Sequence, residues 1–240
     1  MAIKYISVFF LLISYQLSVG QMHNADSTGN TLAAAHAAAT FQQAVHFQKD
    51  IYTGAEHIGY SPLSEGIAYF LTKEWTSGAV LYDGILYGNE SLMYDQVKDK
   101  LVLKRFDGFA VELRSDKITY FTLAGHTFVY INRNHPSGLK EGFYDRLAVG
   151  SLTILVRRIK ILEEQINEMQ LRQQFVQTTI YYALKGNAYD IIKNKASLLS
   201  IVGGRKKDIQ QHLRQQGIKF KSNRELAIIA AAGYYNQTQP

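Results

Sequence analysis

The sequence predicts an α+β fold, in which a long antiparallel β meander, arranged as a sandwich or an open barrel-like sheet, is followed by a small C-terminal pair of helices. Between residues 51 and 195, Tyr, Phe, Val and Ile occur in short runs interrupted by Gly, Asn and Asp, which is typical of antiparallel strands. Some of these interruptions have the composition of tight hairpin turns. After residue 195 the spacing of apolar residues changes from two towards about 3.6, the period of a helix.

The first hairpin is predicted at residues 79–87. Its centre, Asp83-Gly84, suits a type I′ turn because both central residues of that turn need a positive φ. A two-residue loop at this point places Tyr82 opposite Ile85. We therefore expect two antiparallel strands that meet at this turn.

A second hairpin is predicted at residues 100–114, and strand register decides the length of its loop. A two-residue loop would mix charged and apolar side chains on one face, whereas a three-residue loop over 106–108, with Gly108 left-handed, separates them. The expected pairs are Leu103 with Val111 and Leu101 with Leu113. On the other face, Val102, Lys104, Ala110 and Glu112 are expected to point outward.

A third hairpin is predicted to turn at Gly150-Ser151. A two-residue loop there pairs apolar residues on one face, Val149 with Leu152 and Leu147 with Ile154. Further strands are expected at residues 118–123, 127–131, 175–184 and 189–192.

Two helices are predicted near the C-terminus. The first covers residues 205–216, carries Ile209 and Leu213 on one face, and is followed by Gly217, the residue type that commonly ends a helix. The second begins at Ser222-x-x-Glu225, which has the pattern of a capping box. Its expected apolar face consists of Leu226, Ile229 and Ala230.

The N-terminus has the order of a secretory signal peptide. Lys4 precedes an apolar run over residues 6–13, and small residues follow at Ser18 and Gly20. We expect cleavage between Gly20 and Gln21. The alternative, an uncleaved membrane anchor, needs roughly 20 predominantly apolar residues, and polar side chains interrupt this stretch too early.

The remaining boundaries follow from composition. Residues 21–50 hold small and polar residues and an alanine tract around His36, which predicts a flexible or helical leader. The expected organisation is a signal peptide at 1–20, the leader at 21–50, an antiparallel β domain at 51–195 and a helical segment at 196–240 packed on it. The chain has no cysteine, which excludes disulfides, thiolate metal sites, cysteine nucleophiles and a lipid-modified N-terminal cysteine.

Charge is distributed unevenly along the chain. Residues 151–240 contain 14 Lys and Arg against 6 Asp and Glu, whereas the rest contains 12 against 14. A basic C-terminal third is suited to an anionic lipid, an anionic polymer or an acidic partner. The alternative is a solvated basic surface, which the dispersed positions of these charges favour.

Four Tyr-Asp pairs are the most conspicuous candidates for chemistry. Hydrolysis by general acid and base needs two positioned carboxyl groups. The candidate carboxylates are Asp83, Asp95, Asp99 and Asp145. The competing interpretation places each tyrosine on a strand and each aspartate at a turn or on the opposite face, and the uneven intervals favour it.

Other catalytic patterns are missing from the sequence. The seven histidines show no His-x-His or His-Glu-x-x-His spacing, so no metal site and no cofactor are predicted, although His46 and His57 are the pair to test first. No serine lies in Gly-x-Ser-x-Gly. Nucleic-acid binding is not expected either, because an exported protein seldom meets that ligand.

Two groups of residues are candidates for binding. Gly203-Gly204 followed by Arg205, Lys206 and Lys207 leads into a helix and could hold an anion, although a glycine pair before a helix is more often only a turn. Aromatic side chains could form a platform for sugar stacking, with Trp75, Tyr82, Tyr87 and Tyr94 as the candidates. Tyrosine is also an ordinary strand residue.

Several motifs resemble a known set of proteins. They are W-x-x-G-A-V-x-Y-D-G-x-x-Y from Trp75 to Tyr87, Leu92-Met93-Tyr94-Asp95, Asp99-x-Leu101-Val102, Gly142-Phe143-Tyr144, and the tail over 220–236 that ends in Tyr234-Tyr235-Asn236. This pattern resembles exported proteins of unknown function common in Bacteroidetes-type Gram-negative bacteria. The resemblance implies a Gram-negative source and an envelope location. It carries over no catalytic residue, because that group has no established activity.

The sequence therefore predicts an exported protein, periplasmic or associated with the outer membrane, or secreted. A non-enzymatic module that binds an envelope protein or glycan through its sheet is the leading hypothesis. The alternatives are a carboxylate-dependent hydrolase of envelope glycan or peptide, and anionic lipid or polymer binding by the basic C-terminal third. No transmembrane segment is expected after signal removal, which leaves peripheral membrane contact as an option.

Overall fold

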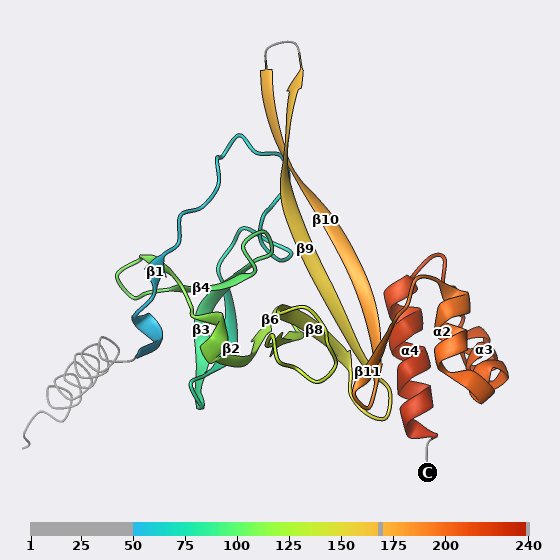
Figure 1. Ribbon diagram of the computed structural model, residues 1–240. Coiled ribbons are helices and arrows are strands. Elements are labelled where there is room, and N and C mark those ends of the chain that lie inside the picture. Colours follow the sequence, from blue (N-terminus) through green and yellow to red (C-terminus); the bar gives the residue numbers. More distant parts are fainter. Residues whose placement is uncertain (1–49, 168–169, 239–240) are drawn as a thin grey trace, which may run out of the picture. The chain divides into compact units, whose positions relative to one another are not determined.

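The computed structural model of the chain describes residues 50–167 and 170–238 (Figure 1). The expected signal peptide, its cleavage site between Gly20 and Gln21, nearly all of the expected leader and His46 lie outside the described residues. No described helix is long and apolar enough to cross a membrane.

The described residues confirm an α+β fold with an open antiparallel sheet. Eleven strands of the described chain form this sheet in the order β1-β5-β4-β3-β2-β6-β7-β8-β9-β10-β11. The strands are β1 (Ala55–Glu56), β2 (Thr76–Tyr82), β3 (Ile85–Asp95), β4 (Lys100–Lys104), β5 (Ala110–Glu112), β6 (Ile118–Leu123), β7 (His126–Ile131), β8 (Gly142–Ala148), β9 (Thr153–Asn167), β10 (Gln170–Lys185) and β11 (Ala188–Ile191). Short 3-10 helices cover Asp50–Tyr52, Ser115–Lys117 and Gly203–Arg205.

The first predicted hairpin is confirmed. Tyr82 pairs with Ile85, and both turn residues have a positive φ, 51° at Asp83 and 78° at Gly84. These are the dihedral signs of a type I′ turn, in which Asp and Gly carry little strain. Local turn chemistry is therefore sufficient to set this register.

The second hairpin has the predicted register but not the predicted outer face. Leu103 pairs with Val111, and Gly108 has a φ of 90° at the end of the three-residue loop. Val102, expected to point outward, is fully buried, and Glu112 is bonded to His57. The expectation of a solvated outer face is wrong here because a chain segment from before β2 contacts it.

The register predicted for the third hairpin is wrong. Ala148 rather than Leu147 pairs with Ile154, and a bulge displaces Leu147. A helix side chain explains the difference, because Asn236 accepts a hydrogen bond from the Leu152 amide and donates to the carbonyl oxygens of Val149 and Leu152. Gly150 allows this contact, since its φ is 151° and a Cβ there would lie 2.5 Å from Asn236 Cγ. A tertiary contact thus overrides the local pattern.

The hairpin of β9 and β10 is longer than the sequence predicts. The two strands pair from Thr153 with Leu184 to Asn167 with Gln170, and Figure 1 shows them as one long twisted ribbon. The expected strand at 175–184 covers only part of β10, and most of β9 is not among the expected strands. The cause is composition, because Glu and Gln residues on both strands remove the alternation that identifies a strand.

Three helices, rather than the expected pair, follow the sheet within the described residues. They are α2 (Lys195–Ile201), α3 (Lys206–Gln215) and α4 (Arg224–Gln237). The prediction for α3 is confirmed, because Ile209 and Leu213 are buried and Gly217 has a φ of 67°. The helix α2 was not expected, although Asn194 and Ser197 form a capping box at its start.

The prediction for α4 is corrected in two respects. Its cap is Asn223 and not Ser222, because the Asn223 side chain accepts a hydrogen bond from the Leu226 amide. The buried face consists of Ala227, Ile228, Ala231, Ala232 and Tyr235, whereas Leu226, expected to be buried, is 45% exposed. Three of these five buried residues are alanines, whereas the predicted face was based mainly on the larger Leu226 and Ile229.

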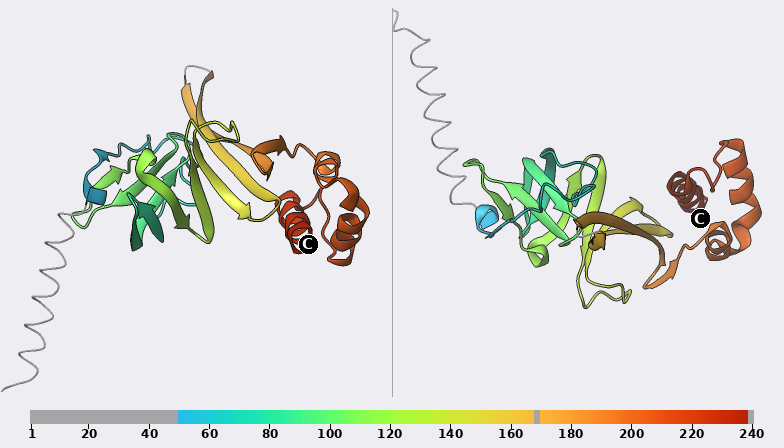
Figure 2. Two further views of the ribbon diagram at one scale, coloured as in Figure 1. Left: turned by 60° about the horizontal axis from the view of Figure 1, so that its bottom comes forward. Right: turned by 90° about the horizontal axis from the view of Figure 1, so that it is seen from above.

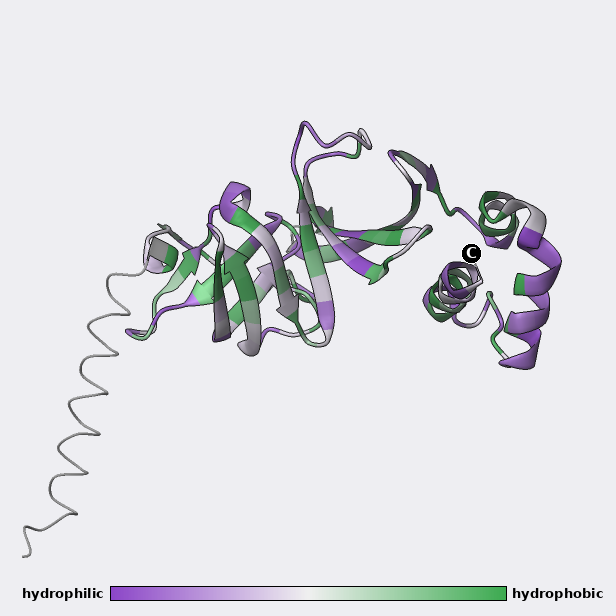
Figure 3. Cartoon of the chain, turned by 90° about the horizontal axis from the view of Figure 1, so that it is seen from below, coloured by the Kyte–Doolittle hydropathy of each residue, from purple (hydrophilic) through white to green (hydrophobic). Residues whose placement is uncertain are grey.

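The apolar core has two main clusters. The first lies among β2–β8 and contains a group of aromatic rings in which Phe121 stacks on Phe128 with centroids 4.7 Å apart. The second joins the helices to the sheet, since Leu152, Ile154 and Val156 are buried with residues of α2, α3 and α4. Figure 2 shows the three helices beside one another, and Figure 3 shows that the helical segment contains both hydrophilic and hydrophobic stretches.

Candidate functional site

The four candidate aspartates have separate sets of partners in the described structure. Asp83 lies at the exposed β2–β3 turn and forms an ion pair with Lys117 at 2.8 Å. Asp95 and Asp145 are fully buried, and Asp99 forms an ion pair with Arg157. No side chain of the described residues hydrogen-bonds to two of these aspartates. The predicted hydrolase site needs two of these aspartates in one cleft. It stays a prediction, because no described side chain connects two of them.

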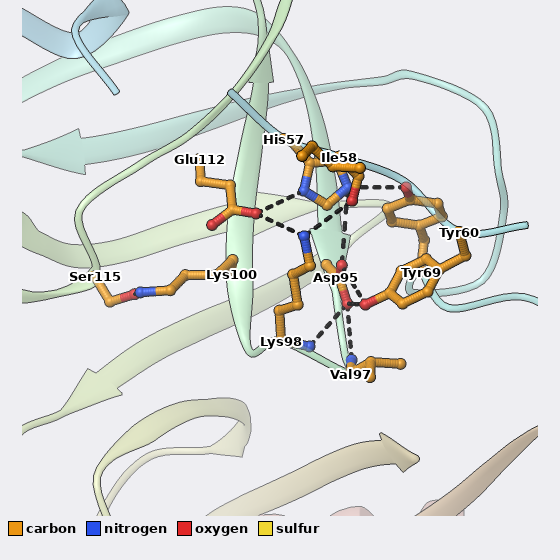
Figure 4. Close-up of polar contacts among 10 residues, drawn as sticks. All are labelled: His57, Ile58, Tyr60, Tyr69, Asp95, Val97, Lys98, Lys100, Glu112 and Ser115. Atoms are coloured by element: carbon orange, nitrogen blue, oxygen red, sulfur yellow. Dashed lines mark hydrogen bonds and ion pairs between the residues drawn. The ribbon is translucent and has the colours of Figure 1, made fainter. Parts of the chain in front are cut away.

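Asp95 is the centre of the polar cluster in Figure 4. It ends β3, and its Oδ1 accepts hydrogen bonds from the amides of Val97 and Lys98 at 2.8 and 3.0 Å, as an aspartate does when it shapes a turn. The Tyr60 hydroxyl donates to both carboxylate oxygens, at 3.0 and 2.8 Å. Burial and this carboxylate raise the pKa of Tyr60 well above its ordinary value. The carboxylate therefore holds a distant loop against the β3–β4 turn.

His57 extends this cluster to β5 (Figure 4). Its Nδ1 lies 2.9 Å from Glu112 Oε1 and its Nε2 lies 2.9 Å from the Tyr69 hydroxyl. Lys98 Nζ donates to the same Glu112 oxygen at 3.0 Å. Burial opposes ionisation of Glu112, but the hydrogen bonds from His57 and Lys98 outweigh it and lower the pKa of this carboxyl group. Both ring nitrogens of His57 are engaged, so this residue lacks a free nitrogen for catalysis.

Lys160, on β9, binds the backbone of residues 67–69, the segment that contains Tyr69. Its ammonium group is buried and donates to the carbonyl oxygens of Ile67 and Tyr69 at 2.8 and 2.7 Å. Burial lowers the pKa of Lys160 to about 8, and the negative charge of Asp95 opposes that shift only in part. A buried lysine bonded to two carbonyl groups fixes the path of residues 67–69.

Asp145 is the centre of a second buried cluster. Its Oδ2 lies 2.8 Å from His126 Nδ1 and accepts hydrogen bonds from Arg158 Nε and Nη2 at 3.1 and 2.8 Å. Arg158 also donates to Glu225 of α4 at 2.8 Å, and the Tyr181 hydroxyl donates to that carboxylate at 2.9 Å. Burial would lower the pKa of Arg158, but its two carboxylate partners raise it. This cluster connects β8 and β9 to the first turn of α4.

Asp99 forms a third polar contact. It accepts a hydrogen bond from the Tyr94 hydroxyl at 2.7 Å and pairs with Arg157 at 2.8 Å. The bridge crosses the backbone at Gly142, whose φ is 138° and where a Cβ would lie 2.1 Å from both side chains. A glycine is therefore required at this position for the pair to form.

The predicted aromatic platform is mostly inside the protein. Tyr82, Tyr87 and Tyr94 are buried, and all three belong to the first core cluster. Trp75 is partly exposed, with Lys104 Nζ 5.9 Å from the centre of its ring. Of these four candidates, Trp75 alone leaves ring area that a ligand could contact.

The strand β11 forms an open end of the sheet. All four of its residues are exposed, with Tyr189 at 38% and Ile191 at 41%. Two hollows of about 510 and 470 Å³ adjoin it, and both are lined by Asp190, Ile191 and Ser197. The strand was predicted from the sequence, but its position at the edge follows only from the order of the sheet.

A larger cavity lies in the helical segment. It has a volume of about 580 Å³ and is lined by the ends of α2 and α3 and by the connection to α4. Lys195, Arg214, Lys219 and Lys221 surround it, with the partly buried Ile218 and Phe220 on its wall. None of these residues was singled out from the sequence. The signal that could have found them is the run Ile218-Lys219-Phe220-Lys221, in which lysines alternate with apolar residues outside a helix.

The predicted anion site lies elsewhere. Lys206 and Lys207 are exposed at the start of α3, and Arg205 donates a hydrogen bond to the carbonyl oxygen of Thr238 near the C-terminus. Arg205 thus anchors the end of α4. These three residues do not line the cavity. In the described part of the chain, no group of three or more His, Asp and Glu residues has the arrangement of a metal site.

Comparison of the chain with protein families, with curated proteins and with solved structures finds no match.

Proposed function

We propose that this chain is a non-enzymatic binding module of the cell envelope, and that an extended segment of a partner protein adds to its sheet along the free edge of β11. The expected signal peptide assigns it to the periplasm or the outer membrane. Strand addition is a common mode of peptide recognition, in which backbone hydrogen bonds give affinity and side-chain pockets give specificity.

The free edge of β11 is the observation that carries this proposal. Among the described strands β11 pairs with β10 alone, with Lys185 opposite Ala188 and Ala183 opposite Asp190. The Ile192 amide donates to the Tyr181 carbonyl oxygen at 2.9 Å, which makes this pair a hydrogen-bonded one. Because bonded and non-bonded pairs alternate in an antiparallel ladder, the backbone groups of Tyr189 and Ile191 face away from β10. No described residue bonds to them. They supply two donors and two acceptors for an incoming strand.

The side chains of β11 suit such a partner. Natural proteins usually protect an exposed edge with lysines, prolines or bulges. Asp190 is the one charged residue of β11, and the exposed Tyr189 and Ile191 lie on the same face of the strand. The adjoining hollows beside α2 offer room for side chains of the added segment. These features favour a protein partner. A glycan is less favoured, because Trp75 is the only one of the four candidate rings that a sugar could contact.

The polar clusters support a role without catalysis. Asp95 and Asp99 each accept a hydrogen bond from a residue distant in sequence, and Asp145 contacts side chains of β7 and β9. The bonds described above join loops, strands and α4 into one scaffold. These carboxylates therefore act as structural contacts that hold the fold together.

Site-directed photocrosslinking in exporting cells tests the proposal. A photoreactive phenylalanine analogue replaces Tyr189, and the same analogue replaces Leu86, a residue that is 59% exposed on β3, as the control. We expect a crosslinked partner protein from position 189 and none from position 86. Ile191→Pro removes an amide on the free edge without touching the β10 ladder, and it should abolish the crosslink, whereas Ile191→Val should retain it. Equal crosslinking at both positions, or none at 189, would contradict the proposal.

A hydrolase acting on envelope glycan or peptide has one observation in its favour. His126 is partly exposed, its Nδ1 contacts the buried Asp145, and its Nε2 has no hydrogen-bond partner among the described residues. An aspartate behind a histidine is the arrangement that orients a general base. Purified protein incubated with envelope polymers tests this alternative. If the alternative is right, the wild-type protein hydrolyses a polymer and His126→Gln does not. The alternative is rejected if the wild-type protein leaves the polymers intact.

A further inference from the structure

The cavity lined by the start of α2, the end of α3 and the connection to α4 has an unusual charge distribution. Lys195 begins α2, Arg214 lies in the last turn of α3, and Lys219 and Lys221 belong to the connection before α4. None of these four cations forms an ion pair within the described chain. Between residues 195 and 237 there are only two acidic residues, Asp208 and Glu225. Glu225 is already bonded to Arg158 and Tyr181, so the positive charge at the cavity is not neutralised locally.

The wall of the cavity is apolar. Ile218 and Phe220 are partly buried and pack against the second core cluster, so the protein interior supports them. The connection is held in place from the end of α3, because the Ile218 amide donates to the carbonyl oxygen of Leu213 at 2.9 Å and Gly217 adopts a φ of 67°. This arrangement keeps an apolar surface open beside unpaired cations. Its volume of about 580 Å³ is in the range of small-molecule sites.

The chemistry of the cavity selects among ligands. A metal cation is repelled by four positive side chains. An inorganic anion would use the charges and leave the apolar wall in water, and a neutral apolar molecule would do the reverse. A ligand with an anionic head and an apolar chain satisfies both parts of the site. In a cell envelope, an anionic phospholipid has this composition, and lysines near a membrane surface each contribute about 1 kcal/mol of attraction.

From these observations we infer that the cavity binds an anionic lipid. The phosphate group lies among Lys195, Arg214, Lys219 and Lys221, and the first part of an acyl chain lies against Ile218 and Phe220. The site differs from the β11 edge and does not depend on the proposed partner protein. It also differs from the sequence-predicted anion site, because Lys206 and Lys207 lie outside the cavity.

Two double variants with the same change in charge test the position of the site. Lys219→Gln with Lys221→Gln removes two cations from the cavity, and Lys206→Gln with Lys207→Gln removes two exposed cations of α3 outside it. Protein purified from exporting cells is sedimented with phosphatidylglycerol or phosphatidylcholine vesicles. The wild type should bind the anionic vesicles, and the cavity variant should lose about ten-fold or more in affinity, consistent with two lysines near a membrane. The control variant should lose less than about three-fold.

A soluble competitor tests the two parts of the ligand. Dodecyl phosphate, below its micellar concentration, should displace the protein from anionic vesicles, whereas inorganic phosphate and dodecyl maltoside at the same concentration should not. Three outcomes overturn the inference. They are an equal loss of affinity in both double variants, which indicates diffuse charge; competition by inorganic phosphate alone; and tighter binding of a glutamate-rich peptide than of dodecyl phosphate. Melting temperatures of all variants confirm that each is folded.

Discussion

The sheet and the helical segment differ in whether their charged residues have ion-pair partners. In the sheet, the fully buried Asp145 is paired with Arg158, and the partly buried Asp99 is paired with Arg157. In the helical segment, Lys195, Arg214, Lys219 and Lys221 surround a cavity without a carboxylate partner in the described chain. The paired charges of the sheet are shielded from water and bonded to protein groups, whereas the cations around the cavity are exposed to water.

This difference separates structural charges from charges that are available to a ligand. A buried ion is costly unless its partners satisfy it, so removing a partner destabilises the fold. An exposed cation costs little, so its removal leaves the fold intact and changes only what the protein can bind. Substitutions in the two regions should therefore have opposite effects on stability and on binding.

The largest loss of stability is expected at Asp145. Asp145→Asn removes the charge that Arg158 and His126 contact in a fully buried position. Leaving a buried cation with a weakened partner should lower the free energy of unfolding by about 3 kcal/mol. Urea denaturation of the wild type and the variant measures this change.

Asp83→Asn is the matched control. Asp83 also pairs with a cation, Lys117, but it lies at an exposed turn, and asparagine tolerates its φ of 51°. We expect a much smaller change there than at Asp145. Similar losses at both positions would break the distinction between buried and exposed pairs in the sheet.

An effect of similar size is expected from the titration of Lys160. Burial lowers the pKa of this lysine to about 8 in the folded protein, and in the unfolded chain the pKa returns to 10.5. Between these values the unfolded chain holds a proton that the folded chain has released, so the free energy of unfolding should rise with pH. The contribution of Lys160 over the whole window is about 3 kcal/mol.

Urea denaturation between pH 7.0 and 8.0 measures this slope, in a range where tyrosines, whose ordinary pKa is about 10, are still protonated in the unfolded chain. Lys160→Met removes the titrating group and should flatten the dependence, although it also removes the bonds to the carbonyl oxygens of Ile67 and Tyr69. A rising slope that persists in this variant would assign the effect to another group. A falling slope in the wild type would show that the lysine is not desolvated.

The contact between the two regions should have an intermediate effect. Asn236→Ala removes three hydrogen bonds between α4 and the β8–β9 loop. We expect a loss of about 1–2 kcal/mol in the free energy of unfolding, because the backbone groups it bonds are partly buried. Gln237→Ala, at the exposed neighbouring residue, should have little effect in the same denaturation experiment. Equal changes would mean that Asn236 does not hold the loop.

Sequence predicts best those features that neighbouring residues decide. The Asp83-Gly84 turn and the pairing of Leu103 with Val111 follow from turn chemistry and alternation over a few residues, and both are confirmed. The third hairpin fails because Asn236, distant in sequence, sets its register. The face of α4 fails because its contact surface uses Ala227 and Ala231, which a search for large apolar residues passes over.

The candidate sites depend even more on contacts between residues that are far apart in the sequence. Asp95 and Asp145 stand out in the sequence, but their partners come from other strands and loops, so their structural contacts could not be derived from spacing. Edge position at β11 depends on the order of the whole sheet. The cavity depends on how three helices meet, and only the alternation of Lys219 and Lys221 with apolar residues is local.

The smallest change in stability is expected where the largest change in lipid binding is expected. Lys219→Gln with Lys221→Gln removes two exposed cations that have no ion-pair partner in the described chain. Surface substitutions of this kind usually change the free energy of unfolding by less than about 0.5 kcal/mol. Relief of repulsion among the cations at the cavity should offset part of any loss, so the melting temperature should stay near that of the wild type. A marked destabilisation would mean that these lysines have structural partners and belong with the paired charges of the sheet.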